Sequence, residues 1–382
     1  MQILIITKNY PPTVDGVGDY SFQLQKALRT CNNTFEFYIA TSKSKECTEL
    51  EGKFFYFQHW NKNEFKLLKN FIKEKSISVV LVQYVPYSYH KLGVPFKLVS
   101  LISDLGLNLI TVFHEVRIKL IPWRKNFIIG LGQLLCARVL YNRSKYIITS
   151  NFHYKKLISD KDSYNKIRVI PVGSNLSSDE KNRIIKSEAS KSKFVITSFG
   201  QSIRCWRTIL NASSKLLNDI PSLQVLLIGA LPEDDKRWIN AEAKKLNIDH
   251  IVKVTGKISA ISVHQLLKEC DLYLMLENFS YNNWTGTSFR SGSLAAALEA
   301  HLPVIGNEGE LTNPGIQNCE GIILLKTTTV DSLVDAILNF YCLSDQQKKE
   351  RKKSIESLFK TEISWNAIAK SYLEVISSAV SC

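Results

Sequence analysis

Short apolar runs alternate with segments of helical periodicity along most of the chain. The first run, residues 2–7, is continuously apolar, and apolar residues then recur at helical spacing over residues 20–29. A continuous apolar run of this length predicts a strand buried on both faces, as in a parallel sheet. Similar runs predict further strands at residues 34–40, 79–83, 109–113, 146–149 and 167–170, with helices at 63–74 and 91–105 between them.

The alternation breaks once and then restarts. Residues 174–192 are mostly polar, and apolar runs resume at residues 194–198, 223–228, 252–255, 272–276, 303–306 and 322–325. Alternating strands and helices predict an α/β fold with doubly wound parallel sheets, which bind ligands at the carboxyl ends of their strands. We therefore predict Rossmann-like domains at residues 1–173 and 193–360, joined by a linker at 174–192. The amphipathic segment 361–382 is expected to pack back on the first domain as a helix.

Charge and cysteine content narrow the classes of partner. The net charge of +14 favours anionic partners such as phosphates, nucleotides or an anionic membrane surface. The lysines are scattered, without a dense basic tract carrying interleaved aromatics, so a nucleic-acid partner is disfavoured. Eight cysteines without a CxxC pair indicate reduced thiols in a cytoplasmic protein. Because neither HExxH nor a Cys/His cluster is present, we expect no bound metal and no cofactor.

The stretch TGTSFRSGSLAAALEAHLPVI, residues 285–305, is the strongest candidate for an anion site. Its small and hydroxylated residues lead into a helix former, and Gly292 and Ser293 stand where that helix begins. A helix N-terminus presents backbone N–H groups without intrahelical partners together with the positive end of the dipole. Arg290 adds a donor fork that matches phosphate geometry. The competing interpretation is an ordinary Ser-capped helix.

Three other strand ends carry candidate residues. Gly16 and Gly18 follow the first strand and are interpreted as a flexible loop that faces a ligand, with a plain turn as the alternative. His114 and Glu115 follow the strand at 109–113, where a histidine is suited to hydrogen bonding or proton transfer, although a lone histidine is more often structural. The turn after the strand at 194–198 carries two arginines that suit a diphosphate, with a solvated basic turn as the alternative.

Residues 123–146, WRKNFIIGLGQLLCARVLYNRSKY, combine large apolar and basic side chains. A helix of this composition can lie on an anionic bilayer surface. The alternative is a core helix with a basic outer face. The apolar run at 127–137 is too short to span a bilayer.

Several of these motifs, in this order, resemble the GT-B glycosyltransferases, specifically glycosyltransferase family 4, over essentially the full chain. The matching segments are ILIITKNYPPTVDGVGDYSFQL, VQYVPYSY, VFHE, SKYIITSNF, VIPVGSN, LQVLLIGA and the stretch that ends in LPVIG. The resemblance implies a first domain that binds the acceptor and a second that binds a nucleotide sugar. It also implies sugar transfer without a metal, usually with retention of configuration, to a glycan or a lipid-linked acceptor.

Combined with the strand-end pattern, the resemblance assigns the site residues. Three are assigned to catalysis: His114, Arg204 and Arg290. Nine are assigned to donor and phosphate binding: Gly200, Gln201, Arg207, Gly229, Glu277, Thr287, Ser288, Gly292 and Ser293. Six are assigned to the acceptor side: Asp15, Gly16, Gly18, Asp19, Tyr84 and Glu115.

The chain departs from the family pattern in the second domain. The usual Glu-x7-Glu pair falls on Ser288 and Ala296, so both carboxylates are missing, and an Arg/Gly/Ser turn opens the helix instead. Arg204 aligns with the family's lysine, while the place of its arginine is lost in a shorter loop. These departures leave a second hypothesis, a non-catalytic sugar-nucleotide or glycan-binding partner of an active transferase. Burial of Arg290 in an ion pair would favour it.

Overall fold

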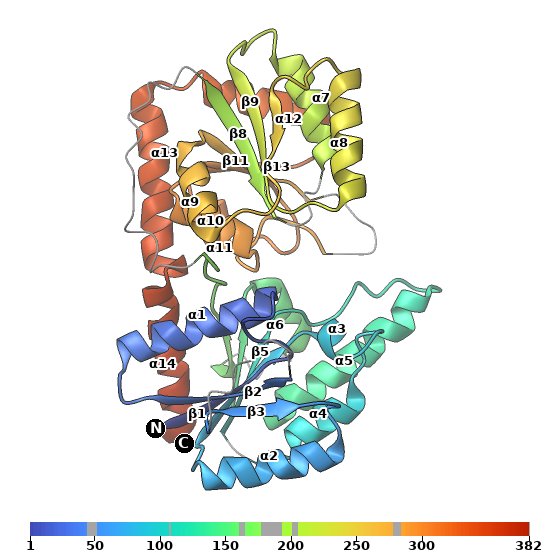
Figure 1. Ribbon diagram of the computed structural model, residues 1–382, viewed down its shortest axis with the longest axis vertical. Coiled ribbons are helices and arrows are strands. Elements are labelled where there is room, and N and C mark those ends of the chain that lie inside the picture. Colours follow the sequence, from blue (N-terminus) through green and yellow to red (C-terminus); the bar gives the residue numbers. More distant parts are fainter. Residues whose placement is uncertain are drawn as a thin grey trace. The chain divides into compact units, whose positions relative to one another are not determined.

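The chain divides into two compact α/β units. A computed structural model describes residues 1–43, 52–106, 108–159, 165–176, 193–200, 205–277 and 284–381. The first unit comprises Met1–Asn175 and Glu362–Cys382, and the second comprises Leu176–Thr361. Each has a sheet flanked by helices, which confirms the predicted fold class (Figure 1). In the described part of the chain, no helix is long and apolar enough to cross a membrane.

The first unit contains a parallel sheet in the order β3-β2-β1-β4-β5-β6-β7. Its strands are β1 (Gln2–Ile6), β2 (Glu36–Ser42), β3 (Phe54–Phe57), β4 (Val79–Tyr84), β5 (Asn108–Phe113), β6 (Tyr146–Thr149) and β7 (Ile167–Val169). Its helices are α1 (Gly16–Cys31), α2 (Lys62–Glu74), α3 (Pro86–Tyr89), α4 (Phe96–Ser103), α5 (Lys125–Arg143), α6 (Phe152–Ile158) and α14 (Trp365–Ser381). The strand order reverses direction between β1 and β4, which is where such sheets bind ligands.

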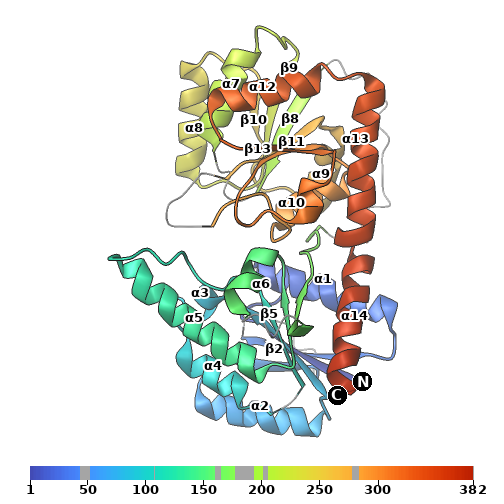
Figure 2. The same cartoon turned by 180° about the vertical axis from the view of Figure 1, so that it is seen from behind.

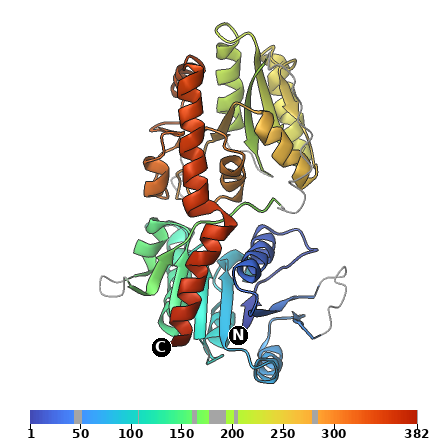
Figure 3. The same ribbon diagram turned by 90° about the vertical axis from the view of Figure 1, so that its left-hand side faces the viewer.

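The core of the first unit explains why the C-terminal helix belongs to it. Alternate side chains of β1, β2, β4 and β5 pack with α1 and α14 in one buried cluster. The two helices lie side by side (Figure 3), and the hydroxyls of Tyr20 and Tyr372 hydrogen bond at 2.8 Å inside this layer. The predicted return of the C-terminal helix to the first domain is thus confirmed.

The second unit repeats the topology with the order β10-β9-β8-β11-β12-β13. Its strands are β8 (Phe194–Phe199), β9 (Leu223–Ile228), β10 (Val252–Val254), β11 (Leu272–Met275), β12 (Val304–Asn307) and β13 (Ile322–Leu325). Its helices are α7 (Trp206–Leu216), α8 (Glu233–Lys245), α9 (Ala260–Glu269), α10 (Gly292–Glu299), α11 (Pro314–Gln317), α12 (Val330–Tyr341) and α13 (Asp345–Leu358), and a π-helical turn follows at Phe359–Ile363. The switch point here lies between β8 and β11.

Candidate functional site

The switch point of the second unit is built from glycine turns. Gly200 and Gly229 follow β8 and β9, with φ angles of 154° and 135°. A Cβ at position 229 would lie 2.2 Å from the carbonyl oxygen of Gly200, so the two backbones touch where no side chain fits. Both glycines thus lie at the edge predicted for the donor. Gln201 and Arg204, assigned to the same turn, lie outside the described residues.

Glu277 organises the loop that follows β11. Its side chain is 5% exposed, and its carboxylate accepts hydrogen bonds from the Gly286 N–H and the Arg290 guanidinium, each at 3.1 Å. Its backbone N–H donates to Oδ1 of the buried Asn307 at the end of β12, at 2.8 Å. The Arg290 side chain is still 22% exposed. Both residues assigned from the sequence therefore meet in one ion pair, which fixes the guanidinium at the sheet edge.

The two hydroxyl residues of this loop differ in their surroundings. Thr287 is fully buried, and its hydroxyl oxygen accepts from the Asn307 N–H at 3.0 Å, which ties the loop to β12. This bond gives Thr287 a structural role that the sequence does not reveal. Ser288 is 1% exposed, and among the described residues its hydroxyl has no hydrogen-bond partner. Since an unsatisfied buried hydroxyl is costly, Ser288 is the better candidate for a ligand contact.

The N-terminus of α10 has the geometry expected of an anion site. Ser291 caps the helix by accepting from the Leu294 N–H at 3.2 Å, and its hydroxyl lies 3.0 Å from that of Ser293. Ser293 also hydrogen bonds Tyr273, whose pKa burial raises to about 12. Gly292 is the first helical residue, so no side chain covers the helix end at that position. Cap, hydroxyl pair and dipole together favour a bound oxyanion.

Arg207 belongs to a different element, helix α7. It is exposed in the first turn of α7, and its guanidinium lies 4.9 Å from the ring centroid of Trp238 on α8. A cation–π contact of this kind provides an alternative role for the charge, which the sequence does not reveal.

In the first unit, His114 follows β5 and is half-buried. Its Nε2 lies 2.7 Å from Oε1 of Gln83, and the ring contacts Tyr20 edge to face with centroids 5.1 Å apart. Because the amide oxygen only accepts, the ring carries its proton on Nε2 and presents Nδ1 as an acceptor. Burial lowers the pKa of His114 to about 4, against a smaller raising effect of Asp15. The imidazole is therefore neutral at physiological pH.

The glycines after β1 do not form the predicted flexible loop. Gly16 and Gly18 lie in the first turn of α1, because the Asp15 carboxylate accepts from the Val17 and Gly18 N–H groups at 3.1 and 2.8 Å. Gly18 is required for packing, since a Cβ there would lie 2.8 Å from the Asn9 carbonyl oxygen. Asp19 lies in the same turn, and its pKa is raised by burial and by the charge of Asp15.

Tyr84 is also displaced from its predicted role. It is fully buried and packs edge to face on Phe113, so its ring belongs to the core and does not face an acceptor. Glu115, after His114, is half-buried.

The first unit also has a pocket that the sequence analysis missed. It measures about 530 Å³ and is lined by Lys8, Trp60, Tyr89, His90 and Lys97 together with Gln58, His59, Val94, Pro95, Phe96 and Leu98. Lys8 lies 5.1 Å from the Trp60 ring centroid, and burial lowers its pKa. The lining thus combines cations and aromatic rings at the edge predicted to bind the acceptor.

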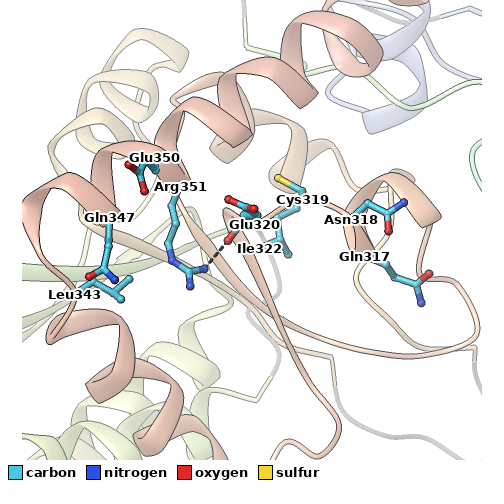
Figure 4. A pocket seen from close by; sticks show the side chains of 9 residues that line it. All are labelled: Gln317, Asn318, Cys319, Glu320, Ile322, Leu343, Gln347, Glu350 and Arg351. Carbon is cyan, nitrogen blue, oxygen red and sulfur yellow. Dashed lines mark hydrogen bonds between the residues drawn. The ribbon is translucent and has the colours of Figure 1, made fainter.

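A second pocket lies in the second unit, beside the start of β13. Figure 4 shows its lining, which includes Ile322 at the start of β13, Glu320, and Arg351 of α13, whose guanidinium donates to the Glu320 carbonyl oxygen. None of the sequence-assigned residues lines it.

Comparison with solved structures supports the fold. The chain matches sucrose-phosphate synthase from Thermosynechococcus elongatus with a TM-score of 0.71 at 14% identity, covering 100% of this chain and 99% of that one. It matches Anabaena HepE in complex with UDP and glucose with a TM-score of 0.69 at 14% identity, covering 99% and 100%. WaaG, a glycosyltransferase involved in lipopolysaccharide biosynthesis, gives 0.64 at 12% identity, covering 98% and 99%.

Sequence comparison adds no closer assignment. No family model matches the chain, and no curated protein matches it. At identities of 12–14% the structural matches establish architecture, and they do so over the whole chain. The protein has the GT-B fold that is found in these glycosyltransferases.

Proposed function

We propose that the protein is a metal-independent, retaining glycosyltransferase that moves a sugar from a nucleotide-sugar donor to a glycan or lipid-linked acceptor in cell-surface polysaccharide biosynthesis. The observation that carries the proposal is the loop before α10, at the sheet's switch point. There Arg290 and an uncovered helix N-terminus accompany the Ser288 hydroxyl, which hydrogen bonds none of the described residues. HepE, with the same fold, has been crystallised with UDP and with UDP-glucose.

Each residue has a defined part in this proposal. The donor diphosphate lies on the N-terminus of α10, where Gly292 and Ser293 supply N–H and O–H donors. Arg290 balances the negative charge that grows as the nucleoside diphosphate leaves, and Glu277 holds the guanidinium in place for that task. Arg204 is assigned to the same charge. His114, neutral and oriented by Gln83, accepts a hydrogen bond from a sugar hydroxyl at Nδ1.

A thermal-shift panel of UDP, GDP, ADP, TDP and CDP tests donor binding. A ligand at ~100 times its dissociation constant adds roughly 2.7 kcal/mol to the stability of the state it binds. We expect one nucleotide to raise the melting temperature of the wild type, and the increment to shrink in Arg290→Ala and in Arg290→Lys. Arg237→Ala is the matched control, because Arg237 is exposed on α8 of the same unit and pairs with Asp234. No shift with any nucleotide would contradict the proposal.

The ion pair between Arg290 and the buried Glu277 favours a second candidate, a non-catalytic binding partner. Such a protein would still bind phosphate but would not transfer sugar. Its Arg290 charge would already be neutralised by Glu277 and could not stabilise the leaving nucleoside diphosphate. The two candidates differ in release of nucleoside diphosphate from the nucleotide sugar that the panel selects. Release above the rate without protein, reduced in His114→Ala, supports the transferase. Binding without release in the presence of candidate acceptors supports the binding partner.

A further inference from the structure

Helix α5 is apolar on its outward face as well as on its inward one. Its inward residues, among them Gln133, Cys136 and Leu140, are buried against the unit. Five large apolar side chains of α5 are exposed: Phe127 (37%), Ile128 (76%), Leu131 (38%), Leu135 (53%) and Val139 (39%). Spacings of three, four and four residues place the last four on one side of the helix as a continuous stripe. The exposed face of α5 thus carries this apolar stripe as well as the exposed basic residues Lys125, Arg138 and Arg143.

A tryptophan stands just before the start of the helix. Trp123 is fully exposed and has a φ of 62°. A bulky residue in the left-handed region is strained, and such strain concentrates at functional positions. An indole combines a large apolar surface with one N–H donor, which is why tryptophan is enriched where hydrocarbon meets water. The backbone thus presents to solvent a side chain suited to a lipid interface.

The neighbouring loop widens the patch. Leu92 and Phe96 are 54% and 48% exposed in a segment next to α5, where a Cβ at Gly132 would lie 2.9 Å from the Val94 side chain. Phe96 begins α4, which packs beside α5 (Figure 2). We call the whole set the α5 face, comprising Leu92, Phe96, Trp123, Ile128, Leu131, Leu135 and Val139. A patch of this kind on a soluble chain marks an interaction surface.

The charge around the α5 face is of one sign. Residues 116–159 contain nine Lys and Arg and no Asp or Glu. Lys125, Arg138 and Arg143 are exposed on the helix itself. On a helical projection Arg138 falls on one side of the apolar stripe, and Lys125 and Arg143 fall on the other. An apolar stripe between two cationic borders complements a surface that has hydrocarbon beneath a layer of negative charge.

We propose that the α5 face docks the protein on an anionic lipid bilayer. The helix lies in the interfacial plane, with its apolar stripe in the acyl boundary and its basic borders among the headgroup phosphates. Trp123 enters the interface ahead of the helix. This inference concerns binding to the bilayer itself and does not depend on the transfer reaction.

Vesicle flotation with the full-length protein tests the proposal in the absence of donor and acceptor. We expect the wild type to float with vesicles that contain phosphatidylglycerol and much less with phosphatidylcholine alone. Ile128→Gln with Leu135→Gln should weaken binding at least tenfold, on the order of the loss expected for two apolar anchors. Replacing Arg138 and Arg143 by glutamine should weaken vesicle binding about fivefold for each charge removed. Brominated lipid should quench the tryptophan fluorescence of the wild type more than that of the Trp123→Phe variant.

Matched controls separate lipid docking from changes in folding. Leu67 of α2 is 58% exposed outside the α5 face, so Leu67→Gln should bind vesicles like the wild type. All variants should keep the wild-type melting temperature. Equal flotation of wild type and the Ile128/Leu135 variant would overturn the proposal, as would no flotation at all. Concentration-dependent self-association that the same variant abolishes would instead identify the α5 face as a contact between copies of the chain.

Discussion

At the scale of single residues, burial changes the pKa of an ionisable side chain, and His114 is the clearest case. Its pKa falls from the ordinary value of 6.5 to about 4 because burial disfavours the imidazolium. Between these pH values the unfolded chain binds a proton at this histidine that the folded chain does not. The free energy of unfolding is therefore at its full value above about pH 6.5 and falls as the pH drops toward about 4. At about pH 5 the loss should reach roughly 2 kcal/mol relative to pH 7.5.

Urea unfolding of the wild type and His114→Gln at these two pH values measures this contribution. The wild type should lose roughly 2 kcal/mol more than the variant on acidification. Because Asp19 and other carboxyls titrate in both proteins, the difference between them isolates the histidine. Equal losses would show that the imidazole is not held neutral by the fold.

The sequence predicted the position of a site residue only where that residue directly follows a buried strand. His114 and Glu277 each follow a buried strand, and both lie at the predicted edge. Tyr84 and Tyr89 flank one turn, yet Tyr84 packs into the core while Tyr89 lines the pocket, and the sequence carries no signal for that choice. The Arg290–Glu277 pair also depends on Asn307, which accepts from the Glu277 N–H and lies far away in the sequence.

At the scale of elements, a glycine in a turn and a glycine in a helix should respond oppositely to substitution by alanine. Gly229 has a φ of 135°, and a Cβ there would meet the Gly200 backbone at 2.2 Å. Gly229→Ala should therefore destabilise the second unit by more than about 1 kcal/mol and weaken nucleotide binding. Gly16 lies in helix α1, and a Cβ there would meet no atom within 4 Å, so Gly16→Ala should stabilise by about 0.4–1 kcal/mol. Thermal unfolding of both variants checks the opposite signs.

Element prediction succeeded where hydrophobic pattern and local structure agree. The central strands β1, β4, β5, β8 and β9 are predominantly apolar because both faces of a parallel sheet are covered. Strand β3 was missed because its four residues, all aromatic, at the sheet edge lack a distinguishing period. Helix α13 was missed because its sequence, DQQKKERKKSIESL, is polar almost all round and buries only Ile355 and Leu358. The start of α1 was placed late because the Asp15 cap overrides the glycine signal.

For the whole molecule, the main consequence of the topology is that the first unit is closed by the last segment of the chain. Helix α14 contributes Ile368, Ala369, Tyr372, Val375, Ile376 and Ala379 to the core that α1 and the first sheet share. Burying a large apolar side chain contributes about 1.5–3 kcal/mol. Losing four of them therefore costs on the order of 10 kcal/mol, comparable to the total stability of a typical domain.

Deleting residues 362–382 should consequently unfold the first unit and leave the second unit folded, since Leu176–Thr361 keeps its own core cluster. Hydrogen exchange followed by mass spectrometry should show loss of protection in β1, β4 and β5 with protection retained in β8, β9 and β11. Tyr372→Phe is the graded control, because it removes one buried hydroxyl pair and should cost about 1 kcal/mol without unfolding either unit. Native protection of β1 in the deletion variant would mean that the sheet and α1 suffice for the first unit, and that α14 is an accessory to the fold.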